Sequence, residues 1–132
     1  MFSDLHVLLI DDNKLDNFIH RKVLERLPSV KKIHEYNDAR EALDFLKNSE
    51  ALFPVVIFLD LRMPGHDGFY FLREFQELPE SVKQQARVLI LSSSVDEHDM
   101  EEVKKSGLET RFLTKPLTLE LAENVLRSTE AS

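Results

Sequence analysis

The stretch Val55-Val56-Ile57-Phe58-Leu59-Asp60 joins five consecutive apolar residues to a carboxylate. A continuous apolar run is typical of a strand that is buried on both faces of a parallel sheet. A carboxylate beside such a run is costly unless it has left the core or has partners. The next residues, Leu61-Arg62-Met63-Pro64-Gly65, favour a loop. We therefore expect Asp60 at the carboxyl end of a central strand, facing the crevice where open α/β sheets bind ligands.

Three further apolar segments end in polar residues. Val7-Leu8-Leu9-Ile10 leads into Asp11-Asp12, Val88-Leu89-Ile90-Leu91 into Ser92-Ser93-Ser94, and Phe112-Leu113 into Thr114-Lys115-Pro116. Segments of helical period alternate with these runs, which predicts an α/β domain with a parallel sheet and helices on both faces. Right-handed crossovers then bring the ends of the first, third and fifth strands together.

The expected elements follow from apolar spacing and from capping residues. Strands are predicted at residues 5–10, 30–36, 55–59, 87–91 and 109–113, with 30–36 near an edge because it carries several charges. Residues 79–85 are predicted to form a polar loop, and Gly107 to follow a helix as its left-handed C′ residue. The expected inward-facing helix residues are Leu15, Phe18, Ile19, Val23 and Leu27; Ala39, Ala42, Leu43 and Leu46; Phe69, Leu72 and Phe75; Met100 and Val103; and Leu119, Ala122, Val125 and Leu126.

Length and composition favour one domain over residues 1–132, with one core. The chain has no Cys, so disulfides and thiolate chemistry are excluded, and a reducing compartment is expected. It also has no apolar run near the roughly 20 residues of a membrane span, and its N-terminus lacks the basic start of a signal peptide. A formal net charge of −7 disfavours nucleic acid and anionic membranes as partners. We expect a cytoplasmic protein.

The acidic residues Asp11, Asp12 and Asp60 predict a cation site. A single Asp after a strand often only caps the next helix, but three carboxylates at one sheet edge repel one another unless a cation lies among them. Oxygen ligands without Cys or His favour Mg²⁺. The five His residues, at positions 6, 20, 34, 66 and 98, lack the spacing of ligands, and we expect them at the surface or in loops, with His66 alone near the site.

Lys115 and Ser92 complete the expected site. A Lys in a loop is usually only solvated, but this one follows the last strand and precedes Pro116, where a cis peptide is allowed. Its ammonium could pair with Asp60, and the Ser92 hydroxyl could bond the same anion. A carboxylate nucleophile, a divalent cation, a hydroxyl and an ammonium suit phosphoryl transfer. No Gly-rich phosphate loop is present, so a nucleotide is not the expected substrate.

Taken together, these segments resemble the receiver domains of two-component response regulators (CheY-like) over nearly the whole chain. The resemblance rests on Ile10-Asp11-Asp12, on Leu59 to Gly65 with Asp67-Gly68, on Leu91-Ser92-Ser93 and on Thr114-Lys115-Pro116. It implies a flavodoxin-like (βα)5 three-layer sandwich with strand order 2-1-3-4-5. It further implies a stand-alone receiver, a monomer or weak dimer that phosphorylates and dephosphorylates itself rather than a conventional enzyme.

The resemblance also assigns roles. Asp60 is the phosphoacceptor for a phosphohistidine on a sensor histidine kinase or a histidine phosphotransfer protein. Asp12, Asp60 and the backbone carbonyl of Arg62 bind Mg²⁺, with Asp11 acting mainly through water.

The remaining implied roles concern the response. Ser92 and Lys115 hold the phosphoryl oxygens. Ser92 and Phe112 act as the switch, with Phe where relatives often have Tyr, and Arg62 and Ser94 tune the lifetime of the acyl phosphate. The surface of the helix at 96–106, the strand at 109–113 and the last helix then changes its affinity for an unknown protein target.

Three other functions compete. A haloacid-dehalogenase-type phosphatase needs an acid two residues after its nucleophile, where this chain has Arg62, and it needs room for a cap domain. A flavodoxin-like electron carrier needs hydroxyls and amides in the first loop, where Asp11-Asp12 would repel the cofactor phosphate. The strongest alternative is a pseudo-receiver scaffold that binds partners without phosphorylation.

Overall fold

In the computed structural model, which describes residues 5–48, 54–94, 96–108 and 110–130, five parallel strands form one sheet in the order β2-β1-β3-β4-β5. This order confirms the expected flavodoxin-like arrangement, with β2 at an edge. The two central strands, β1 and β3, end side by side, since Ile10 pairs with Leu59. The strands are β1 Leu5–Ile10, β2 Val30–Tyr36, β3 Val55–Leu59, β4 Ala86–Ser92 and β5 Arg111–Thr114.

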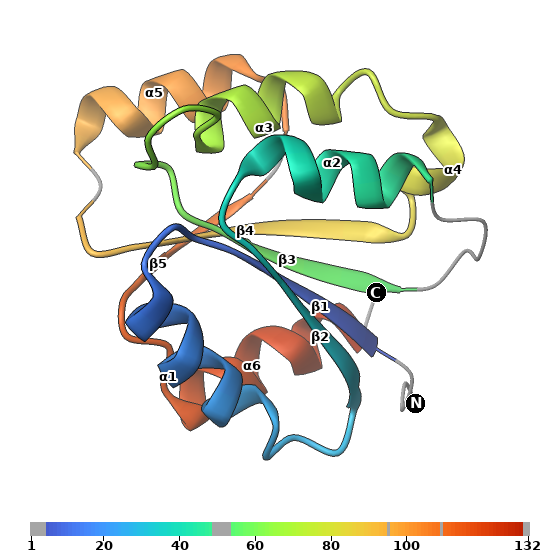
Figure 1. The fold of residues 1–132 in the computed structure, drawn as a ribbon, viewed down its shortest axis with the longest axis vertical. Coiled ribbons are helices and arrows are strands. Elements are labelled where there is room, and N and C mark those ends of the chain that lie inside the picture. The colour runs from blue at the N-terminus through green and yellow to red at the C-terminus, as the bar shows by residue number, and fades with distance from the viewer. Residues whose placement is uncertain (1–4, 49–53, 95, 109, 131–132) are drawn as a thin grey trace.

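The helices cover both faces of the sheet and create two cores (Figure 1). On one face α2, α3 and α5 pack over side chains such as Ile57, and on the other α1 and α6 pack over side chains such as Phe58. Because neighbouring residues of β3 point to opposite faces, its uninterrupted apolar run supplies both cores. The helices are α1 Lys14–Leu24, α2 Ala39–Lys47, α3 Gly68–Phe75, α4 Glu80–Lys83, α5 Glu97–Lys105 and α6 Leu119–Glu130.

Side-chain caps and a glycine mark the helix ends, and Gly107 follows its helix as predicted. The side chains of Asn13 and Asp38 cap α1 and α2 by accepting from backbone N–H groups, and Gly107 adopts a φ of 77° just after α5. Gly68 is needed for its lack of a side chain, since a Cβ there would lie 2.6 Å from the carbonyl oxygen of Asp60. Only glycine therefore lets α3 begin directly against the loop that follows β3.

The inward face predicted for the first helix is confirmed at Val23 and Leu27, which pack in the core, and is wrong at the three other positions. Leu15, Phe18 and Ile19 are 66%, 55% and 39% exposed, whereas the buried residues of the helix are Asn17, His20 and Leu24. The apolar three–four spacing misleads here because the sheet-facing side of α1 is partly polar. Three large apolar side chains are left on the surface as a result.

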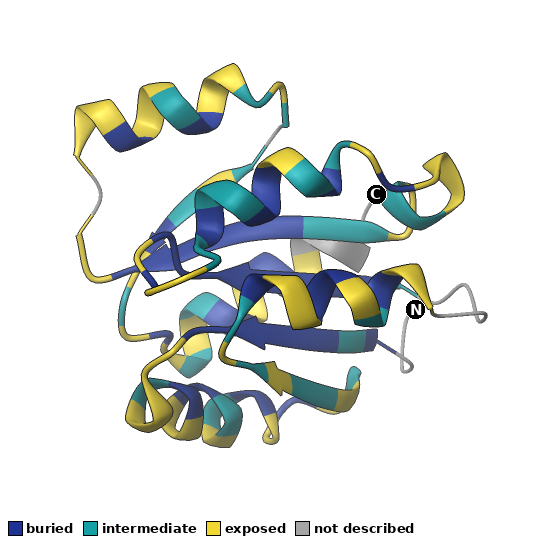
Figure 2. Ribbon diagram, turned by 45° about the horizontal axis from the view of Figure 1, so that its top comes forward, coloured by how far each residue is buried: buried dark blue, intermediate teal, exposed yellow. Residues whose placement is uncertain are grey.

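The helix α5 also departs from the prediction. Met100 is 38% exposed, and the buried residues of α5 are Val103 and the carboxylate Asp99. Figure 2 shows this helix as mostly exposed, with few buried positions. The segment predicted as a polar loop contains the short helix α4, which no side chain caps. The predicted start of the fifth strand, residue 109, lies outside the described residues, as do residues 1–4.

Candidate functional site

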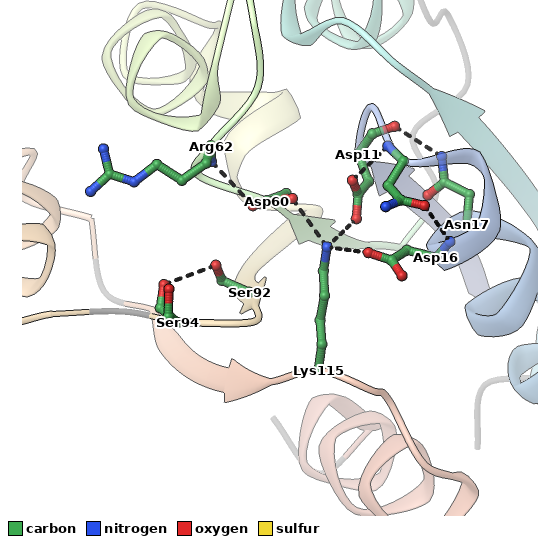
Figure 3. Close-up of polar contacts among 9 residues, drawn as sticks. Asp11, Asp16, Asn17, Asp60, Arg62, Ser92, Ser94 and Lys115 are labelled. Carbon is green, nitrogen blue, oxygen red and sulfur yellow. Dashed lines mark hydrogen bonds and ion pairs between the residues drawn. The ribbon is translucent and has the colours of Figure 1, made fainter.

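The ammonium of Lys115 lies at the centre of a cluster of carboxylates at the carboxyl edge of the sheet (Figure 3). Lys115 Nζ is 2.6 Å from Asp11 Oδ2, 2.8 Å from Asp16 Oδ2 and 3.1 Å from Asp60 Oδ2. These residues come from the end of β1, the first turn of α1, the end of β3 and the loop after β5. The expected meeting of the first, third and fifth strand ends is confirmed. The Lys115–Pro116 peptide bond is cis.

The site is largely shielded from water. Asp11 and Asp60 are 5% and 8% exposed, and the Lys115 side chain is 10% exposed. Burial raises the pKa of Asp11 although hydrogen bonds from Lys115 and Asn13 oppose the shift. Burial alone would lower the pKa of Lys115, but hydrogen bonds to Asp11 and Asp16 outweigh it, so the pKa of Lys115 is raised. Lys115 is therefore a fixed positive charge.

The carboxylates of Asp11, Asp12 and Asp60 converge. One oxygen from each lies within 4.8 Å of the others, and Asp12 is the exposed member, at the mouth of the site. The ammonium of Lys115 is shared with Asp16 as well, so the cluster of three carboxylates keeps an excess of negative charge. Hard oxygen ligands at such separations suit a small divalent cation such as Mg²⁺.

Backbone groups fix the two buried carboxylates. The backbone N–H of Asn13 donates to Asp11 Oδ1 at 2.9 Å, and the side-chain amide of Asn17 holds the backbone of the same residue by donating to the Asp11 carbonyl at 2.9 Å. On the other side of the site, the N–H of Arg62 donates to Asp60 Oδ1 at 3.1 Å. The acidic groups are thus oriented by α1 and by the loop after β3.

The side chains of the other predicted residues point elsewhere than to Asp60. The buried Ser92 hydroxyl donates to the carbonyl of the exposed Ser94 at 3.1 Å. Phe112 on β5 is half-buried and packs against the core on the α5 side of the sheet. The Arg62 side chain points away from Asp60 and pairs with Asp99 on α5.

Two residues of the site were missed by the sequence reasoning. Asp16 binds Lys115, and its place in the first turn of α1, just after the Asp11–Asp12 pair, was the available signal. His20, predicted at the surface or in a loop, is 2% exposed and lines a small cavity with Asp11 and Asp60. Burial, and then the charge of Lys115, lowers the pKa of His20.

The expectation that His66 alone lies near the site is therefore wrong. His66 instead pairs with Asp38, at 3.3 Å, and packs against the ring of Tyr70.

A doubly covered parallel sheet, with a buried Asp at the end of its central strand beside further acids and a fixed Lys, defines the class of flavodoxin-like α/β domains with an acidic pocket at the carboxyl edge of the sheet. Residues 7–127 match the family model described as the response regulator receiver domain. The chain belongs to this family and is a CheY-like receiver of two-component signalling, of the phosphoacceptor type.

Similar proteins agree with this assignment. A response regulator receiver protein from Dyadobacter fermentans is 31% identical, with a TM-score of 0.83 and coverage of 95% of this chain and 97% of that one. The receiver domain of the histidine kinase CKI1 from Arabidopsis thaliana, complexed with Mg²⁺ and BeF₃⁻, is 22% identical, with a TM-score of 0.78 and coverage of 96% and 90%. The second likeness concerns the fold alone.

A curated relative, the sensor histidine kinase CheAY of Helicobacter pylori, is 32% identical over 131 residues, which are 95% of this chain. This chain spans 15% of the length of CheAY and 8% of the length of a hybrid histidine kinase from Dictyostelium discoideum. Among the described residues, no helix has the length and apolar character needed to cross a bilayer.

Proposed function

We propose that this receiver takes a phosphoryl group from a phosphohistidine onto Asp60 and thereby changes its affinity for a protein partner. The single observation that carries the proposal is the position of Asp60: it ends the central strand, within 3.1 Å of a fixed ammonium and inside an acidic cluster. In the transfer, an Asp60 oxygen attacks phosphorus, the P–O bond forms as the P–N bond breaks, and the histidine nitrogen leaves.

The surrounding residues supply charge and donors. Lys115 lies where its ammonium can bond an oxygen of the transferred group, since it already bonds the acceptor carboxylate. Ser92 has to turn its hydroxyl from the Ser94 carbonyl toward the site to add a second bond. We assign Phe112 to follow that movement, because it lies on β5 beside β4 and is only half-buried.

The acidic cluster fits Mg²⁺. We infer that Asp12, Asp60 and the backbone carbonyl of Arg62 bind the ion directly and that Asp11 acts mainly through water. When bound, the ion neutralises charge on the acceptor and on the transferred group. The fit rests on the donor set: three carboxylates whose oxygens lie within 4.8 Å, two of them buried.

Intact-mass measurement tests this proposal. With Mg²⁺ and acetyl phosphate, the wild type gains one phosphoryl group and Asp60→Asn gains none. A matched control, Asp44→Asn, removes an exposed carboxylate of α2 and is modified like the wild type. A wild type that stays unmodified with acetyl phosphate and with phosphohistidine donors would support the pseudo-receiver scaffold instead.

The exposed apolar residues of α1 supply a surface for the phosphodonor. Leu15, Phe18 and Ile19 lie on the helix whose first turn carries Asp16, a contact of Lys115. A protein that delivers a phosphoryl group to Asp60 must approach this edge of the sheet. Large apolar side chains there would bury area against it.

The surface is tested apart from the chemistry. Phe18→Ala should accept phosphoryl from acetyl phosphate at the wild-type rate and from a phosphohistidine protein at least about tenfold more slowly. Met100→Ala, which removes an exposed apolar side chain from α5, serves as the control. If the phosphohistidine protein transfers its phosphoryl group to Phe18→Ala as fast as to Met100→Ala, the donor docks on a surface other than α1.

A further inference from the structure

The helix α5 is attached to the domain by few buried groups. Of its nine residues only Asp99 and Val103 are buried, and Asp99 is a carboxylate that lies 2% exposed. A buried carboxylate needs a partner. Within the described part of the chain, the guanidinium of Arg62 is the cation that pairs with it. The ion pair is therefore one of two anchors for this helix.

Arg62 connects this anchor directly to the phosphoacceptor. Its backbone N–H donates to Asp60 Oδ1 at 3.1 Å, while its side chain pairs with Asp99. Figure 3 shows the two ends of the residue pointing in opposite directions, one toward Asp60 and the other away from it. A single residue thus spans the distance from the reactive carboxylate to α5.

The guanidinium crosses a groove between α3 and α5. The groove has a volume of about 440 Å³, and Arg62, Phe69 and Asp99 are among the residues that line it. Arg62 Cζ lies 5.7 Å from the centroid of the Phe69 ring on α3. The Arg62 side chain itself is 62% exposed, so water can hydrate the guanidinium if a stronger anion draws it away from Asp99.

We propose that the Arg62–Asp99 ion pair is a latch that holds the amino-terminal end of α5, and that phosphorylation of Asp60 opens it. The inference rests on the proposed function and names its means of regulation. An aspartyl phosphate carries more negative charge than the single carboxylate of Asp99. It forms beside the loop that holds Arg62, so it competes for the guanidinium, and α5 is then held by Val103 with an uncompensated Asp99 beside it.

The latch also predicts an effect in the reverse direction. If phosphorylation weakens the ion pair, then loss of the ion pair must favour the phosphorylated state by the same factor. Asp99 is in this sense a positioning residue: it acts on the site through Arg62, because it keeps the guanidinium turned away from Asp60.

Amide hydrogen exchange of residues 97–105 tests the latch, with Mg²⁺ present and with or without beryllofluoride as the phosphoryl mimic. Without beryllofluoride, Arg62→Met and Asp99→Asn should each speed exchange by about tenfold, and the double variant no further, because all three lose the same contact. Arg62→Lys, which keeps the charge, should restore most of the protection. Arg73→Met is the matched control, since it removes a cation from the α3 wall of the same groove.

With beryllofluoride, wild-type exchange should rise to that of Arg62→Met, and Asp99→Asn should bind beryllofluoride up to about tenfold more tightly than the wild type. The latch would be overturned if Arg62→Met exchanged at the wild-type rate without beryllofluoride. It would also be overturned if Arg62→Met exceeded the wild type by the same factor with and without beryllofluoride. If the wild type binds no beryllofluoride and gains no phosphoryl group, the proposed function fails and the latch with it. If the wild type binds beryllofluoride but the exchange of residues 97–105 is the same with and without it, the latch alone is overturned.

Discussion

Replacement of Lys115 by Met tests the electrostatics of the site most directly. Met keeps most of the length and the apolar character of the stem and removes the ammonium, with its charge and its hydrogen-bond donors. Lys115 makes three contacts to carboxylates at 2.6, 2.8 and 3.1 Å. At an effective dielectric constant of about 20, each contact is worth about 5 to 6 kcal/mol before the cost of desolvation.

The net effect on stability is smaller, because folding removes all of these groups from water. Removal of one partner of a buried ion pair typically costs about 3 to 5 kcal/mol. We expect the lower end, about 3 kcal/mol in the free energy of unfolding, because the Asp16 side chain is 29% exposed and can turn to solvent. For a domain of 132 residues this corresponds to a fall in Tm of about 10 °C.

Magnesium should reverse most of this loss. Without the competing ammonium, the carboxylates bind Mg²⁺ more tightly, and saturation at about 100 times Kd adds about 2.7 kcal/mol. The assay is urea unfolding followed by circular dichroism, in EDTA and in saturating Mg²⁺. Lys105→Met, an exposed lysine on α5, serves as the control and should change stability by less than about 0.5 kcal/mol. An unfolding free energy for Lys115→Met in EDTA equal to or above that of the wild type would refute the reasoning.

Three further outcomes are expected. Gly68→Ala should lower the free energy of unfolding by about 2 to 3 kcal/mol and slow phosphorylation by acetyl phosphate, because its Cβ would lie 2.6 Å from the Asp60 carbonyl oxygen; wild-type stability by thermal unfolding would contradict this. Asp16→Asn should raise the affinity for beryllofluoride, measured by titration, because one competitor for Lys115 loses its charge; weaker binding would show that Asp16 supports the site. Burial lowers the pKa of His20, so its contribution to the free energy of unfolding is fully present above the unfolded pKa of 6.5 and is lost as the pH falls below it. The free energy of unfolding, measured from pH 7.5 to 5, should therefore fall less steeply in His20→Gln than in the wild type, and an equal slope would exclude His20 as a source of the pH dependence.

The sheet and the main site were predictable from the sequence because each rests on a strong local signal. The apolar runs that end at Asp11, Asp60 and Lys115 fix where the strands stop, and a parallel sheet brings those ends to one edge. The caps at Asn13 and Asp38 likewise lie only two or three residues before the backbone N–H groups that donate to them. No long-range information was needed for these features.

The errors arose where a polar side chain takes a buried position that apolar spacing would give to a hydrophobic one. On α1 the buried face includes Asn17 and His20, which serve the site, so the apolar pattern pointed to the solvent side. On α5 Asp99 is buried because Arg62, 37 residues earlier, supplies its charge partner. A pairing between residues so far apart in the sequence does not affect the spacing of apolar residues along the helix, so that spacing cannot predict it.

The start of α1 joins two parts of the molecule that could otherwise be altered separately. Asn13, Asp16 and Asn17 bond the pocket, while Leu15 and Phe18, interleaved with them, point outward. If the phosphodonor docks on Leu15 and Phe18 as proposed, a redesign of donor choice is confined to the outward-facing positions in the first two turns of α1. A substitution at Asp16 or Asn17, next to these positions in the sequence, would instead alter the reactivity of Asp60 toward every donor.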